Sequence, residues 1–375
     1  MRRRLKLWAG CVLLIGVGMF NVPVTVAAPA RQQSLTIQGQ LTLGTLDGTA
    51  IPSGLPVELQ MISVRDGLLQ TQSIPTNADG SFTFVNVPRF GSEIFYTLSA
   101  VYAGLRQSTP PFSADDVDEQ GTIVLRLYET TEQLGNLEIA QATTQIDFTD
   151  VQQVGLKILL ELQIFNLGDR IPYFTNEADP TRLATFHFEL PVGAYNIAPE
   201  GESGAQRFIL QESVIPVVYD TQPIFPNWPT PHIIRLSYFL PYTGSAVIDQ
   251  VFPVTVNNFS VWVPENAIQV TGDQFAQTKD QKPEGSSLTY HIYKQKSSLS
   301  ANENLKFTLE GVPTRSTTAK SDTSEEGGSA VVALLIGLSV LIIGGAVGYW
   351  VWASRRKAAL ALLDGSSQND DKGTS

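Results

Sequence analysis

Cysteine is almost absent from this chain: its 375 residues include one, Cys11. Cys11 lies near the N-terminus, in a segment that we expect to be removed from the mature protein. A mature chain without cysteine cannot form disulfides or use a thiol nucleophile. Secreted eukaryotic domains of this length usually carry disulfides, so the absence favours a bacterial protein that faces the periplasm or the cell surface.

Histidine is also scarce, with three residues in the whole chain, His187, His232 and His291. None of them belongs to a His-x-x-Glu pair, which a zinc carboxypeptidase needs to hold its metal. His187 and Glu189 share one face of an expected strand, and we interpret them as a solvent-facing polar pair. A Gly-x-Ser-x-Gly nucleophile elbow and a glycine-rich phosphate loop are missing too. We therefore predict no catalytic residue, no cofactor and no enzymatic activity.

Positive charge is in deficit, because 25 lysines and arginines stand against 36 aspartates and glutamates, for a net charge of −11 at pH 7. An acidic protein is repelled by the phosphates of nucleic acid, so we expect no nucleic-acid partner. The acidity does not by itself select a basic partner, since it also serves solubility.

Two long apolar runs stand near the ends of the chain. The first, residues 7–26, follows a basic cluster and precedes the small residues Ala28-Pro29-Ala30. This order is typical of a secretory signal peptide, which we predict for residues 1–30, with an uncleaved signal anchor as the alternative. The second run, residues 330–353, is long enough at about 1.5 Å per residue to cross a hydrocarbon core of roughly 30 Å as a helix.

The charges beside the second run predict its orientation. Arg355-Arg356-Lys357 follows it directly, and positive residues stay on the cytoplasmic side of a membrane. We expect a single-pass, type I protein of the cell membrane with an extracytoplasmic ectodomain. Residues 314–329 have the composition of a flexible stalk. Residues 354–375 read as a disordered cytoplasmic tail, too short for a signalling domain.

Small residues share one face of the predicted transmembrane helix: Ala333, Gly337, Gly344 and Gly348. The Gly344-x-x-x-Gly348 spacing lets two helices approach closely, which suggests self-association within the membrane. The alternative is coincidence, because such spacings are frequent in glycine-rich spans.

Between these runs the chain alternates apolar and polar residues, which predicts an all-β ectodomain of two β-sandwich-like domains in tandem. The first domain is expected at 34–130 and the second at 136–313, with a linker formed by Glu129 to Glu132 and Gly135. Residues 151–165 fit either a strand or a helical segment, and the turn at 166–169 favours the strand. The expected strands lie at 35–43, 57–61, 82–84, 96–102, 124–128, 186–190, 233–242, 250–256, 287–293 and 305–309.

A series of short motifs runs through the first domain in a characteristic order. They are Ile37-x-Gly39, Asp47-Gly48-Thr49, the stretch 76–84, Val87-Pro88 and Tyr96-x-Leu98-x-Ala100-x-Tyr102-x-Gly104. In these residues the domain resembles the carboxypeptidase regulatory-like domain family. The resemblance implies a transthyretin-like sandwich of seven strands, grouped with carbohydrate-binding-like folds, that serves as a non-catalytic accessory.

A related surface family crosslinks such a sandwich through a Lys–Asn or Lys–Asp isopeptide bond. No lysine lies between Lys6 and Lys157, which excludes that bond within residues 34–130.

The densest acidic cluster is expected in a loop between two strands of the first domain. Its residues are Asp115, Asp116, Asp118 and Glu119. Ca²⁺ takes six to eight oxygen ligands, so these carboxylates are a candidate calcium site. The alternative is an ordinary solvated acidic loop, since the spacing of an EF-hand is missing.

Residues 216–242 interleave prolines with aromatic residues. A proline-braced loop can present Phe225 and Trp228 as a stacking surface for a sugar or a protein partner. The alternative is a long connection folded over the sandwich, with its aromatic side chains buried.

Together these features predict a non-enzymatic surface protein that binds or scaffolds an envelope component, with carbohydrate as the first ligand class to test. A second hypothesis is an accessory subunit of a membrane complex, assembled through the transmembrane helix and the proximal domain. A third is an unrecognised hydrolase within residues 136–313.

The second hypothesis can be tested by changing Gly344→Leu and Gly348→Leu together. Bulky side chains would prevent close helix approach, so a partner that co-purifies with the full chain in detergent should be lost. Ala346→Leu, which adds the same side chain on the opposite face of the helix, is the control and should keep that partner.

Overall fold

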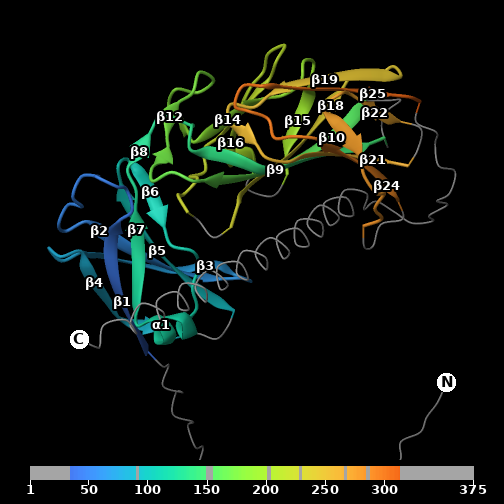
Figure 1. The fold of residues 1–375 in the computed structure, drawn as a ribbon. Helices are drawn as coiled ribbons and strands as arrows, with labels where there is room; N and C mark the ends of the chain where they lie inside the picture. The colour runs from blue at the N-terminus through green and yellow to red at the C-terminus, as the bar shows by residue number, and fades with distance from the viewer. Residues whose placement is uncertain are drawn as a thin grey trace, which may run out of the picture.

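The computed structural model describes residues 34–89, 93–148, 155–200, 204–227, 230–265, 268–283 and 288–312. Strands dominate these residues and form two units, one following the other in the chain (Figure 1). In this part of the chain, no helix combines the length and the apolar character that a membrane crossing requires. The predictions for residues 1–30, 314–329, 330–353 and 354–375 concern residues outside the described ranges.

The first unit is a β-sandwich of seven strands within residues 34–127. One sheet has the order β4-β1-β7, with β1 and β7 parallel, and the other has the order β3-β2-β5-β6. Helix α1 (Ala114–Gln120) connects the two sheets. The strands are β1 (Ser34–Leu43), β2 (Pro56–Ser63), β3 (Gly67–Pro75), β4 (Ser81–Pro88), β5 (Ile94–Tyr102), β6 (Leu105–Ser108) and β7 (Thr122–Leu127).

Alternate residues of these strands fill one core between the two sheets. Ile37, Leu59 and Leu98 are fully buried there. Gly39 in β1 makes room for the Phe82 ring, because a Cβ atom at this position would lie 2.1 Å from ring atoms of Phe82. The glycine therefore allows an aromatic ring to occupy the space that a side chain on β1 would take.

Strand β3 was not expected from the sequence. It lies at the edge of its sheet, and none of its residues is buried. A strand without a buried face carries no alternation of apolar and polar residues, so periodicity cannot reveal it.

The second unit is built on one large sheet with the order β15-β18-β10-β9-β21-β24-β23, and β20 also pairs with β9. Two three-stranded sheets, β14-β17-β16 and β19-β25-β22, contribute to the same core. The strands of the large sheet are β9 (Leu137–Asp147), β10 (Leu156–Asn166), β15 (Tyr195–Pro199), β18 (His232–Leu240), β20 (Thr255–Val256), β21 (Phe259–Pro264), β23 (Phe275–Gln277) and β24 (Tyr290–Gln295). The smaller sheets contain β14 (Phe186–Glu189), β16 (Phe208–Gln211), β17 (Val217–Asp220), β19 (Ser245–Val251), β22 (Gln269–Thr271) and β25 (Asn304–Glu310), and β12 (Phe174–Thr175) pairs with β13 (Leu183–Ala184).

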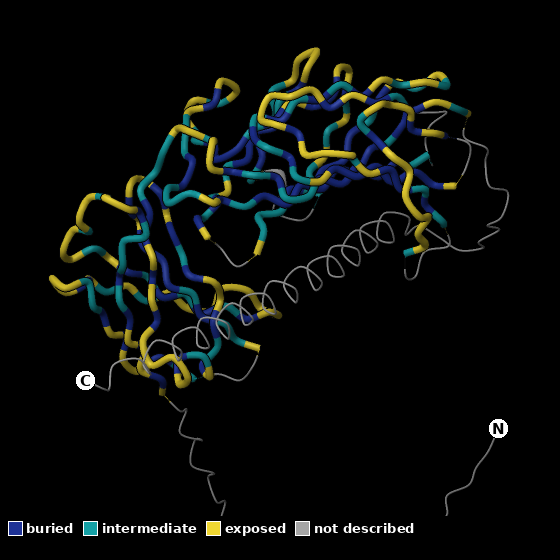
Figure 2. The backbone as a smooth tube through the Cα atoms, viewed as in Figure 1, coloured by how far each residue is buried: buried dark blue, intermediate teal, exposed yellow. Residues whose placement is uncertain are grey.

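The ambiguous stretch 151–165 contains strand β10, as the following turn suggested. Nine of its eleven residues are buried, so the apolar run reflects burial on both faces. The single strand expected at 250–256 is wrong. Pro253 lies between β19 and β20 and cannot donate a ladder hydrogen bond, which separates the two strands. Figure 2 shows buried segments along the strands of both units and exposed segments at the turns.

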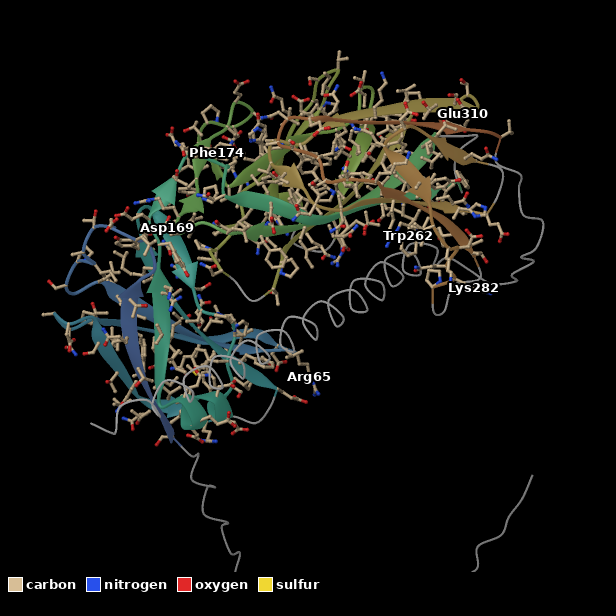
Figure 3. All side chains as sticks on the ribbon, viewed as in Figure 1. Arg65, Asp169, Phe174, Trp262, Lys282 and Glu310 are labelled. Atoms are coloured by element: carbon tan, nitrogen blue, oxygen red, sulfur yellow. The ribbon has the colours of Figure 1, made fainter. Side chains whose placement is uncertain are left out.

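The two units are joined by a paired strand rather than by the expected linker. Strand β8 (Thr130–Thr131) pairs in parallel with β11 (Ile171–Pro172) of the second unit. The turn before β11 reaches into the first unit, where Thr45 Oγ1 donates to the Asp169 carbonyl at 2.9 Å and Leu46 N to Asp169 Oδ2 at 2.8 Å. Figure 3 labels Asp169 at this joint. The pairing was not foreseen because the partner residues lie 41 positions further along the chain, a contact that local composition does not encode.

Gly39→Ala tests the packing of the first core. The added methyl group must displace the Phe82 ring, so we expect the free energy of unfolding to fall by about 1–3 kcal/mol. Urea denaturation of the full chain should show a lower midpoint at unchanged slope. Gly135→Ala, whose Cβ would meet no atom within 4 Å, is the matched control and should leave the midpoint unchanged.

Candidate functional site

A cleft of about 750 Å³ lies where the two units face each other. The first unit lines it with residues of β5, β6 and the following loop, and the second with the end of β10, the start of β18 and the loop before β18. Its residues from the first unit are Thr97, Leu105, Arg106, Ser108, Thr109 and Pro111. We call it the inter-unit cleft.

One wall of the inter-unit cleft is the proline-rich segment that the sequence marked as unusual. Asn166, at the end of β10, fixes this wall because its Nδ2 donates to the Ile224 carbonyl at 2.9 Å. Asn227 N donates to the Asn166 carbonyl at 3.1 Å. The Tyr128 hydroxyl of the first unit donates to the Pro226 carbonyl at 3.3 Å. The segment is therefore held by both units.

A buried ion-pair network forms the base of the same wall. Arg207, at the end of α2 (Gly204–Arg207), donates from Nε to Asp220 Oδ1 at 2.9 Å and from Nη2 to Asp220 Oδ2 at 2.5 Å. His232 Nε2 lies 2.7 Å from Asp220 Oδ2 and 2.7 Å from Arg207 Nη2. Asp220 is fully buried, whereas the side chains of Arg207 and His232 retain 20% and 9% exposure.

The charge of Asp220 is stabilised by these partners. Burial by itself raises the pKa of a carboxyl group, but hydrogen bonds from Arg207 and His232, with the charges behind them, outweigh it and lower the pKa of Asp220. The Gln222 backbone N–H donates a further hydrogen bond to Oδ1 at 2.9 Å. The Asp220 carboxylate therefore remains ionised beneath the cleft.

Among the described residues, the lining of the cleft includes Arg106, Arg207 and His232 but neither aspartate nor glutamate. Each arginine has a carboxylate partner outside the lining: Asp220 is fully buried against Arg207, whereas Glu58, with Oε2 2.5 Å from Arg106 Nη1, is 32% exposed. Arg106 also donates to Ser99 Oγ at 2.9 Å. The cleft thus presents donor groups to solvent, in a protein that is acidic as a whole.

Of the two aromatic residues predicted to bind a ligand, Phe225 lines the cleft. It also packs against the small cluster of Leu105, Tyr128 and Ile171 at the joint between the units. Trp228 lies outside the described residues, as do Ala333, Gly337, Gly344 and Gly348.

The acidic residues proposed for calcium lie on helix α1, not in a loop. Asp116 accepts from the Ser113 backbone N–H and hydroxyl in a capping box, and Arg89 pairs with Asp115 at 2.9 Å and with Asp118 at 2.7 Å. The loop reading failed because Ser113 and Asp116 together start a helix within the connection. Within the described ranges, no three aspartates, glutamates, histidines or cysteines gather in a way that could hold a metal ion.

His187 is half-buried rather than fully solvent-facing. Its ring packs edge-on against Phe174 and lies 5.8 Å from the Tyr219 ring. Burial lowers the pKa of His187. Glu189, on the same strand, is exposed as predicted.

Sequence reasoning missed Arg207, Asp220 and Asn166. Asp220 is the last residue of the apolar strand β17, and a single carboxylate at the end of such a strand is the one local signal of a buried ion pair. Its partners lie 13 and 12 residues away, with turns between, so spacing does not connect them.

Comparison with known proteins gives no family for this chain. No family model matches the sequence, and no curated protein matches it. Among solved structures, a variant of a two-domain M1 zinc metallopeptidase bound to L-tryptophan aligns over 55% of this chain and 54% of its own, at 11% identity and a TM-score of 0.28. The chain thus spans about half the length of that peptidase.

Two pilins align over more of the chain. The major pilin SpaA of Corynebacterium diphtheriae covers 75% of this chain and 84% of its own, at 9% identity and a TM-score of 0.19. The major pilin BcpA of Bacillus cereus covers 74% and 95%, at 8% identity and a TM-score of 0.17. Such low scores carry no inference about function, and the carboxypeptidase regulatory-like resemblance stays a prediction.

Asp220→Asn tests the network at the base of the cleft. The variant keeps the shape of the side chain but leaves Arg207 without its charge partner, so we expect a loss of about 3–5 kcal/mol in the free energy of unfolding. Asp249→Asn, in an exposed pair with Lys306, should cost less than about 1 kcal/mol.

The stability of Asp220→Asn should also differ from that of the wild type in its dependence on pH. A carboxyl group whose pKa is lower in the folded state stabilises the fold above its unfolded pKa of about 3.9, and this contribution is lost as pH falls through the folded value. Denaturation midpoints of the wild type should therefore fall more steeply below about pH 4 than those of Asp220→Asn. Parallel curves would contradict the network as described.

Proposed function

We propose that this chain is a non-enzymatic binding protein of the bacterial cell surface, and that it takes its ligand in the inter-unit cleft. The observation that carries the proposal is the cleft itself: about 750 Å³ in volume, and lined by both units. Ligand sites commonly form where two domains meet, because their surfaces enclose a volume that neither encloses alone.

The lining chemistry favours carbohydrate as the ligand class. Sugar recognition needs hydroxyl and amide groups for hydrogen bonds, together with flat apolar surfaces for the sugar ring. The cleft offers both kinds of group: polar side chains such as Thr109, Gln222 and Thr230, and apolar surfaces at Phe165 and the neighbouring prolines.

Binding is favoured over catalysis by the way the charged groups are engaged. Asp220 already accepts from Arg207, His232 and the Gln222 backbone, so it is not available as a base. His232 directs Nε2 into that network, where Asp220 and Arg207 both lie 2.7 Å away. Groups fixed in this way shape a surface, whereas an acid or base must reach its substrate.

We further propose that the first sandwich is a carboxypeptidase regulatory-like domain. Two features support this proposal. The sandwich has seven strands, and Gly39 closely approaches Phe82, both of which belong to the motifs that carry the resemblance. The predicted signal peptide at 1–30 and membrane helix at 330–353 support the surface location.

A glycan array probed with the full chain tests the proposal. Thr97→Trp places an indole on the cleft wall and should abolish the binding seen with the wild type. Thr71→Trp is the matched control: Thr97 and Thr71 both pair with Gln60, on opposite sides of it, and Thr71 lies outside the cleft lining. It should bind as the wild type does.

The proposal fails if the wild type binds no printed glycan. It also fails if Thr97→Trp and Thr71→Trp bind equally well, because the ligand would then lie elsewhere on the molecule.

A further inference from the structure

The charges of the inter-unit cleft are arranged unlike those of the rest of the molecule. The whole chain carries a net charge of −11, yet the described residues that line the cleft include two arginines, one histidine and no carboxylate. From this contrast we infer that the cleft binds an acidic saccharide, whose carboxylate is held by Arg106 and Arg207. This inference rests on the proposed function and names the class of sugar.

The guanidinium of Arg207 is held in a fixed position by its neighbours, which favours the binding of an anion. Asp220 and His232 engage its Nε and Nη2, and its guanidinium lies 4.7 Å from the centre of the Phe208 ring. Its backbone is fixed as well, since the Thr221 hydroxyl donates to the Arg207 carbonyl at 2.7 Å. No hydrogen bond from Nη1 is present among the described residues, so this group can donate to a ligand. A fixed guanidinium loses little entropy when it binds a carboxylate.

Arg106 supplies a second donor from the opposite unit. It pairs with Glu58 through both terminal nitrogens, and this hydrogen bonding lowers the pKa of Glu58. Its side chain is 51% exposed, and its Nε makes no hydrogen bond in the described part of the chain. Each unit contributes one of these arginines to the lining, so the two can hold one carboxylate only while the joint keeps the units together.

The carboxylates elsewhere do not prevent anion binding. Asp220 is fully buried, and Glu58, which is 32% exposed, has its carboxylate paired with Arg106; neither is among the lining residues of the cleft. At physiological salt the Debye length is about 8 Å, so more distant surface carboxylates are largely screened. The nearby donors, Arg106 and Arg207, therefore determine the charge of the ligand that the cleft prefers.

An acidic peptide is the competing ligand class. The edge strand of the sheet that lines the cleft disfavours the binding of a peptide. A peptide would add to the sheet beside β6, its edge strand. Strand β6 has four residues and is followed by Pro110 and Pro111, which have no N–H to donate. A short edge that ends in proline offers few backbone hydrogen bonds, whereas a sugar needs none.

The test uses the full chain on an array that carries each uronate-containing glycan in two forms, native and carboxyl-reduced. We expect binding to native glycans and a loss of about tenfold or more on reduction, because a hydrogen bond to a charged group is lost. Binding should also weaken as sodium chloride is raised.

Variants assign the effect to the two arginines. Arg106→Gln should weaken binding to native glycans by about tenfold and weaken binding to reduced glycans by clearly less, because only the native form loses a charge-assisted hydrogen bond. Arg207→Gln removes the arginine partner of the buried Asp220 and leaves only His232 and the Gln222 backbone N–H bonded to it. The double variant Arg207→Gln with Asp220→Asn, which keeps the charge balance, therefore serves beside it and should show the same loss. Arg65→Gln, at an exposed pair with Glu93, is the control.

The outcomes separate this inference from the proposed function. Equal binding to native and reduced glycans, lost in Thr97→Trp, overturns the acidic saccharide but keeps the cleft as a sugar site. Binding to an array of acidic peptides, without binding to any glycan, overturns both.

Discussion

The amide side chain of Asn166 holds together the region on which the cleft depends. It is 3% exposed and makes three hydrogen bonds, donating to the carbonyls of Arg170 and Ile224 and accepting from the Gly168 backbone N–H. The first and last of these shape the turn that places Asp169 against the first unit. The second ties the proline-rich wall to the end of β10. A buried amide is stable only when its hydrogen bonds are made, so one residue couples the joint to the cleft.

The joint holds the two units together, so that both contribute to the wall of that cleft. Glu129 illustrates this, because it accepts from the Thr49 backbone at 2.6 Å and from Arg170 of the second unit at 3.3 Å. The hydrogen bonds from Thr49, with that from Arg170, lower the pKa of Glu129. A small apolar cluster of Leu105, Tyr128 and Ile171 lies beside these polar contacts. Such a mixture of buried apolar contact and directed hydrogen bonds fixes orientation, which a flexible linker would leave free.

Much of the fold could be predicted from the sequence because alternation of apolar and polar residues reports a buried face. The strands around Leu59, Phe84 and Leu98 follow that rule, and their side chains are buried in the first core. The rule failed where a strand has no buried face, as in β3, and where a strand exists only through a distant partner, as in β8. It also failed for α1, whose start depends on the mutual hydrogen bonds of Ser113 and Asp116. Phe225 was found because prolines and aromatic residues cluster around it, although its contacts with the joint were not foreseen.

The sequence by itself determined the β-rich character of the chain, its single cysteine and the overall negative charge. These are properties of composition and of neighbours along the chain, where a period of two is enough to tell a strand. Only the tertiary structure decided which side chains meet at the cleft. Asn166 reaches Ile224 across 58 residues, and Thr45 reaches Asp169 across 124. Sheet pairing brings such segments together by backbone hydrogen bonds that every residue except proline can make, so the sequence leaves little local trace of them.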